Sequence, residues 1–316
     1  MKHEVVRCSN SVVTDYYLDI IGKACEQVKC DKKVTITARY RDAVVAKLQG
    51  KRVIFWSQGV GPEEFAMRHN NKIKLFFVNV MAYLALRWSD FSVFVSKAMK
   101  EHYEKKYRIR FAEQKYYIMP CYNTILRKDA FYEKEKYVNN TFVYTGSMEK
   151  WQGVPHILEC YKQIEDSGLP KAKLEIYTAE QETAEQLVKE AGIRNYSIGC
   201  CTNDELQIVL GRVKYGFILR EDNVVNRVST PTKISTYLAN GVIPIYSKCI
   251  SSFHEVASKM TYVVEEEDVE KKIHAFDSMK IESGSVLKEY QQVFKTYYSN
   301  EYHESNLIER LSKIFK

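Results

Sequence analysis

Short apolar runs alternate with segments of helical spacing along the first 120 residues. Runs rich in β-branched and aromatic residues predict strands, and apolar positions three and four residues apart predict helices. We expect strands at 3–8, 33–38, 52–57, 91–96 and 115–119, and helices at 12–29, 40–49, 71–88 and 97–107. This alternation is typical of a parallel sheet with crossover helices.

A second set of alternating elements follows the polar segment 133–140, which has the composition of a linker. The pattern predicts strands at 141–145, 173–178, 195–198, 214–219, 242–246 and 261–264, with helices near 153–166, 180–191, 203–212, 231–240 and 251–258. We therefore expect an α/β chain of two doubly wound, Rossmann-like domains, 1–137 and 138–284. Two helical patterns at 285–316 have no strand after them, and we expect them to pack back on the N-terminal domain.

Composition agrees with a folded two-domain protein of 316 residues, because 45% of the residues are apolar and 28% are charged. The eight cysteines are scattered, without metal-ligand spacing, so we expect neither a metal site nor a disulfide framework, and a reducing cytosol is the simplest setting. No secretory signal pattern opens the sequence. The longest apolar stretch, 75–86, is too short to span a bilayer.

Positive charge is concentrated in the first part of the chain. Residues 1–140 contain 26 Lys and Arg against 15 Asp and Glu, whereas the remainder contains 21 against 25. Such asymmetry points to an anionic partner, with a membrane surface, a phosphorylated acceptor and nucleic acid as candidates. The alternative is a solvated basic surface.

The segment 214–241 contains the most informative chemistry. After the expected strand come Arg220, Glu221 and Asn226, and then the sequence Thr230-Pro231-Thr232-Lys233. Thr230 suits a helix N-cap, Pro231 the first helical position, and Gly241 the stop after the helix. The free amides at this helix start would bind an anion, and Lys233 and Arg220 would add charge. The alternative is an ordinary cap without a ligand.

Two other loops of the second domain follow predicted strands. Gly146 permits a ligand to approach the backbone closely, and Lys150 could reach a diphosphate bound there. Gly199 begins a turn whose backbone could contact a nucleobase edge, although an ordinary helix cap at 202–203 explains the same residues more simply.

In the first domain, a polar loop and the segment after it follow the strand at 52–57. They supply groups that could contact an acceptor hydroxyl: Gln58, Gly59, Glu63, Glu64, Arg68 and His69. His69 by itself is more typical of a surface residue than of a catalytic base. The helix predicted at 71–88 is apolar with a basic start, which fits either a core helix or a helix in a membrane interface.

Several motifs are missing from the sequence. It contains no Asp-x-Asp triplet for a metal-bound nucleotide, no phosphate-binding P-loop and no glycine-rich dinucleotide turn after the first strand. Kinase, NTPase and simple dehydrogenase functions are disfavoured for that reason. No RNA-recognition or helix-turn-helix module is evident, so we expect no nucleic-acid partner.

Four stretches together resemble the bacterial GT4-like glycosyltransferases of the GT-B fold, particularly those that build surface polysaccharides. They are 56–64 (WSQGVGPEE), 93–99 (VFVSKAM), 144–153 (YTGSMEKWQG), and 219–222 (LRED) with 231–241 (PTKISTYLANG). The resemblance implies an N-terminal acceptor domain and a C-terminal nucleotide-sugar domain facing a central cleft, with no metal or other cofactor.

The same resemblance assigns site residues. It implies catalytic roles for Arg220, Lys233 and Lys150 around the diphosphate, and a donor-binding set of Gly146, Ser147, Trp151, Gly199, Glu221, Asn226, Pro231, Thr232 and Thr236. Two positions depart from the family pattern. Thr236 stands where a glutamate usually holds the ribose hydroxyls, and Ser147 stands where an arginine is usual.

These observations predict a retaining, metal-independent glycosyltransferase that uses a UDP- or GDP-sugar and a lipid-linked or polysaccharide acceptor. We expect it in the cytoplasm, at the inner face of the membrane, where its basic domain would meet anionic lipid. The alternative, motivated by Thr236 and Ser147, is a non-catalytic GT-B subunit that stabilises a partner transferase. An epimerase of the same fold would need an acid–base pair that the sequence does not reveal.

Overall fold

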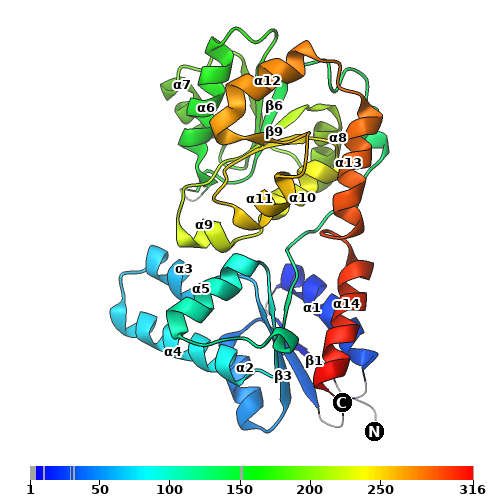
Figure 1. Cartoon of the computed structure of the whole chain (residues 1–316). Helices are drawn as coiled ribbons and strands as arrows, with labels where there is room; N and C mark the ends of the chain where they lie inside the picture. Colours follow the sequence, from blue (N-terminus) through cyan, green and yellow to red (C-terminus); the bar gives the residue numbers. More distant parts are fainter. Residues whose placement is uncertain (1–4, 10, 29, 31–32, 150–151, 316) are drawn as a thin grey trace. The chain divides into compact units, whose positions relative to one another are not determined.

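The computed structural model describes residues 5–9, 11–28, 30, 33–149 and 152–315. The chain forms two compact units. Unit 1 consists of Met1–Cys121, Arg227–Thr230 and Lys295–Lys316, and unit 2 consists of Tyr122–Asn226 and Pro231–Phe294. Each unit contains one parallel sheet with helices around it, which confirms the predicted α/β class (Figure 1).

The sheet of unit 1 has five parallel strands in the order of the chain. They are β1 (Val5–Cys8), β2 (Val34–Thr37), β3 (Arg52–Ser57), β4 (Phe91–Phe94) and β5 (Tyr116–Ile118). The central strands are rich in β-branched and aromatic residues, and every residue of β2 and β4 is buried. Because the order is sequential, this sheet shows no reversal of strand order among the described residues.

Four helices of unit 1 are close to their predicted positions: α1 (Val12–Glu26), α2 (Tyr40–Leu48), α4 (Lys72–Trp88) and α5 (Lys97–Tyr107). The helix α3 (Gly61–Arg68) and the 3-10 helix η1 (Glu113–Lys115) are additions. The pattern did not predict α3, because its first turn lies in a glycine-rich segment and contains Pro62. No described helix is long and apolar enough to cross a membrane.

The sheet of unit 2 has six parallel strands whose order reverses in the middle. The strands are β6 (Thr141–Thr145), β7 (Lys173–Tyr177), β8 (Tyr196–Gly199), β9 (Tyr215–Ile218), β10 (Ile243–Tyr246) and β11 (Val264–Glu265), in the order β11-β10-β9-β6-β7-β8. The chain therefore adds strands on one side of β6 and then on the other. This is the strand order of a doubly wound nucleotide-binding sheet, with its switch point between β6 and β9.

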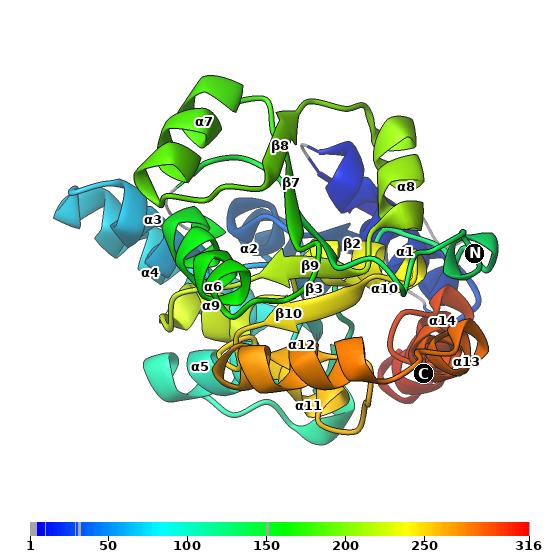
Figure 2. The same ribbon diagram turned by 90° about the horizontal axis from the view of Figure 1, so that it is seen from above.

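Helices cover both faces of this sheet: α6 and α7 lie on one side, and α8 and α10 lie on the other (Figure 2). The helices are α6 (Val154–Asp166), α7 (Gln181–Glu190), α8 (Asn203–Arg212), α9 (Val224–Val228), α10 (Thr232–Ala239), α11 (Ser251–Ala257) and α12 (Val269–Ser278), with 3-10 helices η2 (Asp129–Phe131) and η4 (Glu266–Asp268). The pattern did not predict α9 or α12.

The last two helices belong to different units. In α14 (Asn300–Ile314), which packs along α1 in unit 1, His303 lies 2.8 Å from the Tyr117 hydroxyl. In α13 (Ser283–Lys295), the Tyr290 hydroxyl donates to the Tyr262 carbonyl of unit 2 at 2.6 Å. We expect both helices to pack on the N-terminal domain; α14 does so, whereas α13 lies almost entirely in unit 2.

Segment 133–140, expected as a linker, lies within unit 2, where the buried side chain of Lys136 holds it. Lys136 is only 1% exposed, and its Nζ donates to the carbonyls of Leu210, Gly211 and Asn240 at 2.7–2.8 Å. The lysine thus joins the ends of α8 and α10. The observed units therefore divide the chain after Cys121, ahead of the expected position between 137 and 138.

Candidate functional site

The switch point of unit 2 brings together the ends of β6 and β9. In open α/β sheets, ligands bind outside the carboxyl ends of the strands at this point. Gly153, which precedes α6, has a left-handed φ of +68°, and a Cβ there would lie 3.1 Å from the Leu219 carbonyl oxygen. The start of α6 therefore lies directly against the end of β9, and a side chain at position 153 would push them apart.

A lysine from α10 reaches into the same region. The Lys233 Nζ donates to the Gln152 amide oxygen at 3.0 Å and lies 4.5 Å from the centre of the Tyr144 ring. A Cβ at Gly146 would lie 2.8 Å from that Nζ, and the φ of Gly146 is +137°. The glycine is therefore needed both for its backbone conformation and for the space that Lys233 occupies.

The electrostatics of this region favour an anion. Burial, together with the positive charge of Arg220, lowers the pKa of Lys233 to about 7. Burial also lowers the pKa of Arg220. Among the described residues, the polar partner of Lys233 is the neutral amide of Gln152. The fold thus holds two half-buried cations near each other, an arrangement that a phosphate or diphosphate would stabilise.

The backbone of Arg220 is fixed by the loop after β10. Its N–H donates to the Ser247 hydroxyl at 2.9 Å, and the Ser247 hydroxyl donates in turn to the Glu266 carboxylate. The other oxygen of Glu266 contacts His156. The sequence gives no signal for Ser247 and Glu266, because only the pairing of distant strands brings them to the site. Tyr144 and Gln152 lie in the predicted stretch 144–153, but nothing local indicates that they contact Lys233.

The start of α10 differs in one detail from the prediction. Thr230 is not the N-cap, because its hydroxyl accepts a hydrogen bond from the Cys121 N–H at 3.0 Å within unit 1. The N-cap is instead Pro231, and the helix begins at Thr232. Gly241 follows the helix with φ +71°, which agrees with its predicted role as the stop.

Thr236, at the position where the resemblance expects a ribose-binding glutamate, points toward another segment of unit 2. Its hydroxyl lies 3.2 Å from the Asn123 side-chain oxygen and 3.1 Å from the Thr124 hydroxyl. The short side chain is therefore accommodated by local hydrogen bonds.

The other donor candidates are distributed around the carboxyl edge of the sheet. The Ser147 carbonyl accepts from the Tyr144 hydroxyl at 2.6 Å, and the Asn226 amide donates to the Glu221 carbonyl at 2.9 Å, which closes the loop after β9. Gly199 ends the edge strand β8, two strands away from β6. The predicted residues Lys150 and Trp151 lie outside the described residues.

The acceptor candidates of unit 1 are largely engaged in contacts within that unit. Gln58 accepts from Thr14 at 3.3 Å, the Gly59 carbonyl accepts from Tyr103 at 3.0 Å, and Glu64 accepts from the Val60 N–H at 3.1 Å. Arg68 and His69 are exposed at the end of α3.

Glu63 has the strongest of these contacts. Its Oε1 lies 2.8 Å from His102 Nε2 and 2.6 Å from Lys106 Nζ, both on α5. Burial acts to raise the pKa of Glu63, but the hydrogen bonds from His102 and Lys106 outweigh burial and lower that pKa. This geometry describes an ion pair that joins α3 to α5.

Comparison with known proteins gives structural matches only. No family model and no curated protein sequence matches this chain. The structure is similar to a complex of S. aureus TarM with Fondaparinux, alpha-GlcNAc-glycerol and UDP, with 9% identity and a TM-score of 0.58 over 94% of this chain and 58% of that chain.

Two further solved structures match over more of their own length. WaaG, a glycosyltransferase involved in lipopolysaccharide biosynthesis, matches with 12% identity and a TM-score of 0.58 over 99% of both chains. The lipopolysaccharide outer core galactosyltransferase WaaB matches with 14% identity and a TM-score of 0.62 over 96% of this chain and 83% of that chain. In two TarM structures and the GtfA/B complex, this chain spans only 57–60% of the matched chain.

At these identities the likeness shows the fold. The chain has the two-domain α/β GT-B fold of glycosyltransferases, as the sequence resemblance predicts. Unit 2 has a doubly wound sheet, and Lys233 and Arg220 lie at its switch point.

Proposed function

We propose that this protein is a glycosyltransferase that moves a sugar from a UDP- or GDP-sugar to a lipid-linked or polysaccharide acceptor in cell-surface glycan synthesis. The observation that carries the proposal is the pair of half-buried cations, Lys233 and Arg220, at the switch point of unit 2. Burial and the charge of Arg220 lower the affinity of Lys233 for protons, and a ligand of opposite charge between the two cations would be bound by charge-assisted hydrogen bonds. The GT-B fold makes a sugar-linked diphosphate the best candidate for that ligand.

The proposed reaction places these cations beside the leaving group. The bond from the anomeric carbon to the diphosphate oxygen breaks, and the acceptor hydroxyl oxygen forms the new glycosidic bond and releases its proton to water. The nucleoside diphosphate leaves with one more negative charge, which Lys233 and Arg220 stabilise. They supply the charge that a metal ion supplies in other transferases, so we propose a metal-independent reaction. The resemblance to GT4-like enzymes adds retention of configuration.

The other predicted residues keep proposed roles around this centre. Lys150 would add a third positive charge to the diphosphate site, and the 146–147 turn would place backbone groups near the phosphates. Unit 1 would bind the acceptor, with Arg68 and His69 as its exposed polar side chains.

We also propose that unit 1 contacts an anionic membrane at the cytoplasmic face, through α4. Ile73, Phe76 and Phe77 on this helix are 74%, 64% and 62% exposed, an unusual position for large apolar side chains. Lys72 and Lys74 flank Ile73 in the first turn of the same helix. Exposed apolar residues beside lysines are typical of a helix lying in a membrane interface.

Calorimetric titration with UDP, GDP and their sugars tests the donor site. We expect at least one nucleotide to bind the native protein and the Arg220→Ala/Lys233→Ala variant to lose that binding by at least about a hundredfold, because two charge-assisted phosphate contacts disappear. Lys189→Ala/Arg194→Ala removes the same charge from exposed positions of unit 2 and serves as the control. Equal nucleotide affinity in both variants would overturn the site assignment.

The second candidate is a non-catalytic GT-B subunit that stabilises a partner transferase. Thr236 favours it, because a hydroxyl bonded to Asn123 and Thr124 occupies the position of the family's ribose-binding carboxylate. If no nucleotide or nucleotide-sugar produces heat or a thermal shift, this partner role replaces the catalytic one.

A further inference from the structure

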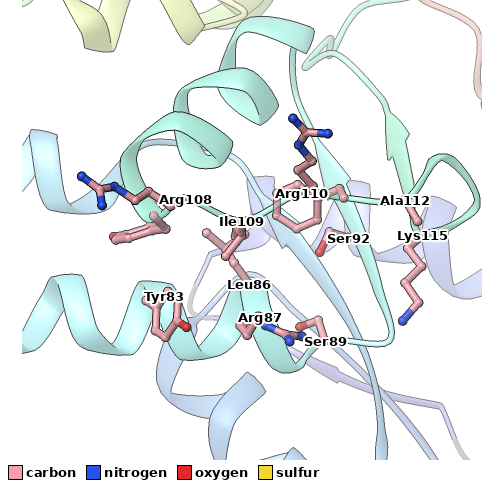
Figure 3. Close-up of a pocket in the computed structure, with 12 residues that line it drawn as sticks. Tyr83, Leu86, Arg87, Ser89, Ser92, Arg108, Ile109, Arg110, Ala112 and Lys115 are labelled. Carbon is pink, nitrogen blue, oxygen red and sulfur yellow. The ribbon is translucent and has the colours of Figure 1, made fainter.

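Unit 1 contains a cavity of about 440 Å³ between the end of α4 and the segment 108–112 that follows α5 (Figure 3). Its volume lies within the usual range for ligand pockets. Tyr83 of α4 and Tyr107 of α5 line it, with their ring centres 5.7 Å apart in an edge-to-face contact. The cavity lies wholly within unit 1 and uses none of the donor or acceptor candidates.

The charged residues that line this cavity all have the same sign. They are Arg87, Arg108, Arg110 and Lys115, and no aspartate or glutamate lines the cavity. All four are exposed, and none forms an ion pair with a carboxylate in the part of the chain that the structure describes. Basic residues at helix ends also interact favourably with the helix dipole. Arg110 and Lys115, however, lie beyond the ends of both α4 and α5.

The wall formed by segment 108–112 is held in a defined conformation. Arg108 has a left-handed φ of +53°, and the Ile109 N–H donates to the Glu104 carbonyl at 3.2 Å. The Glu104 carboxylate accepts from the Phe111 N–H at 2.9 Å and from Lys100 at 2.8 Å. The Glu104 carboxylate is thus used to fix the loop, and it forms its ion pair with Lys100 and not with a cation that lines the cavity.

The α4 wall of the cavity continues the exposed apolar face of that helix. Tyr83 and Arg87 follow Ile73, Phe76 and Phe77 at helical spacing, so they belong to the same side of α4. Arg87 lies roughly 15 Å along the helix axis from Phe77. A bilayer that receives the apolar face would therefore bring its phosphate layer to the cationic cavity.

We propose that this cavity binds the phosphate headgroup of an anionic lipid, an inference that rests on the membrane contact proposed for α4. The cations take the phosphate, the two tyrosine rings contact the glycerol and first acyl carbons, and the apolar face of α4 takes the chains. The cavity would hold one lipid per protein and fix the orientation of unit 1 on the membrane.

The test uses the full chain and lipid monomers, so that no membrane surface is present. We expect dihexanoyl phosphatidic acid, below its micelle concentration, to bind with a stoichiometry of one, and dihexanoyl phosphatidylcholine and inorganic phosphate to bind at least about tenfold more weakly, since each lacks part of the recognised chemistry. Arg108→Asn/Arg110→Gln should weaken binding about thirtyfold, since each basic side chain near an anionic headgroup contributes a factor of about five. Asparagine tolerates the left-handed φ of position 108.

The control, Lys23→Gln/Arg41→Gln, removes two exposed charges elsewhere in unit 1 and should leave lipid affinity unchanged. An unchanged thermal midpoint of both variants shows that they are folded. Inorganic phosphate binding as tightly as the lipid would overturn the lipid assignment, and equal lipid binding by both variants would overturn the cavity assignment.

The result of the lipid titration is independent of the proposed transferase activity and of the proposed membrane contact of α4. Nucleotide titration tests the transferase site in unit 2, and sedimentation of Phe76→Ser/Phe77→Ser with phosphatidylglycerol vesicles tests the membrane face of α4. Neither measurement changes whether monomeric phosphatidic acid binds the cavity.

Discussion

Replacing Lys233 by methionine separates the stability of unit 2 from its proposed function. The substitution keeps the length and much of the apolar contact of the side chain but removes the ammonium that faces Arg220. We expect the Lys233→Met variant to be at least as stable as the native protein at pH 7 and to lose nucleotide binding. An ordinary structural lysine would show the opposite loss of stability.

The magnitude follows from the lowered pKa. Folding takes Lys233 from its usual pKa of 10.5 to about 7, and at about 1.4 kcal/mol per pH unit this corresponds to a cost on the order of 4 kcal/mol near pH 7. Methionine avoids that cost but loses the hydrogen bond to Gln152 and the contact with the Tyr144 ring, worth roughly 2–3 kcal/mol together. The net gain is on the order of 1–2 kcal/mol, or several degrees in the thermal midpoint.

The pH dependence of the free energy of unfolding gives a second measure of the lowered pKa of Lys233. Because the folded pKa of Lys233 is below its unfolded value, the unfolded state binds more protons between about pH 7 and 10.5, and stability rises with pH across that window. Buried Lys136 and Lys214, with pKa values lowered by burial to about 7 and 8, contribute in the same direction in both proteins. Their effect therefore cancels in the difference between native and variant.

Calorimetric unfolding at pH 7 and pH 9 supplies the assay. The native protein should gain more stability than the variant over this range, by about 2–3 kcal/mol. Lys189→Met, an exposed lysine of α7, is the matched control and should follow the native protein. A Lys233→Met variant that is less stable than the native protein at pH 7, with an unchanged pH dependence, would refute the reasoning.

Three further predictions concern the same unit. Nucleotide affinity of the native protein should fall between pH 7 and pH 9 by up to about tenfold per pH unit, with proton uptake on binding seen by calorimetry in buffers of different ionisation enthalpy, because binding requires charged Lys233. Lys136→Met should lower the free energy of unfolding in urea titration at pH 9, because three carbonyls at the ends of α8 and α10 lose their buried donor at about 1–3 kcal/mol each, which exceeds the roughly 2 kcal/mol that the lowered pKa of Lys136 costs at that pH. Gly216→Ala should cost about 1–3 kcal/mol, because its Cβ would lie 2.4 Å from the Tyr237 ring, whereas Gly211→Ala in α8, where the nearest atom would be 3.6 Å away, should be neutral or stabilising.

The pattern of apolar and polar residues was sufficient for most of the secondary structure. Ten of the eleven strands and both C-terminal helices can be followed directly from their periodicity, because spacing of two or 3.6 residues reports which side of an element is buried. The short β11 was expected at 261–264 and lies at Val264–Glu265. The sequence also predicts Gly241 as the residue that stops α10, because glycine adopts the left-handed conformation of a helix end more easily than other residues.

The candidate site was predicted in part by the same local reasoning. Positions after predicted strands are where α/β sheets bind ligands, and this rule predicts Gly146 and Arg220, while the start of the following helix predicts Lys233. It could not identify Tyr144, Gln152 or Ser247 as their neighbours.

Only the tertiary structure decided the order of the strands and the environment of each charge. The pairing of β6 with β9, about 70 residues apart in the chain, makes the switch point and brings the Lys233 ammonium against the Gly146 backbone. The tertiary structure also directs the Cys121 N–H to the Thr230 hydroxyl, and it buries Lys136 in a segment that has the composition of a linker. The physical reason is that capping and periodicity act over a few residues, whereas burial and charge proximity depend on which distant segments the fold brings together.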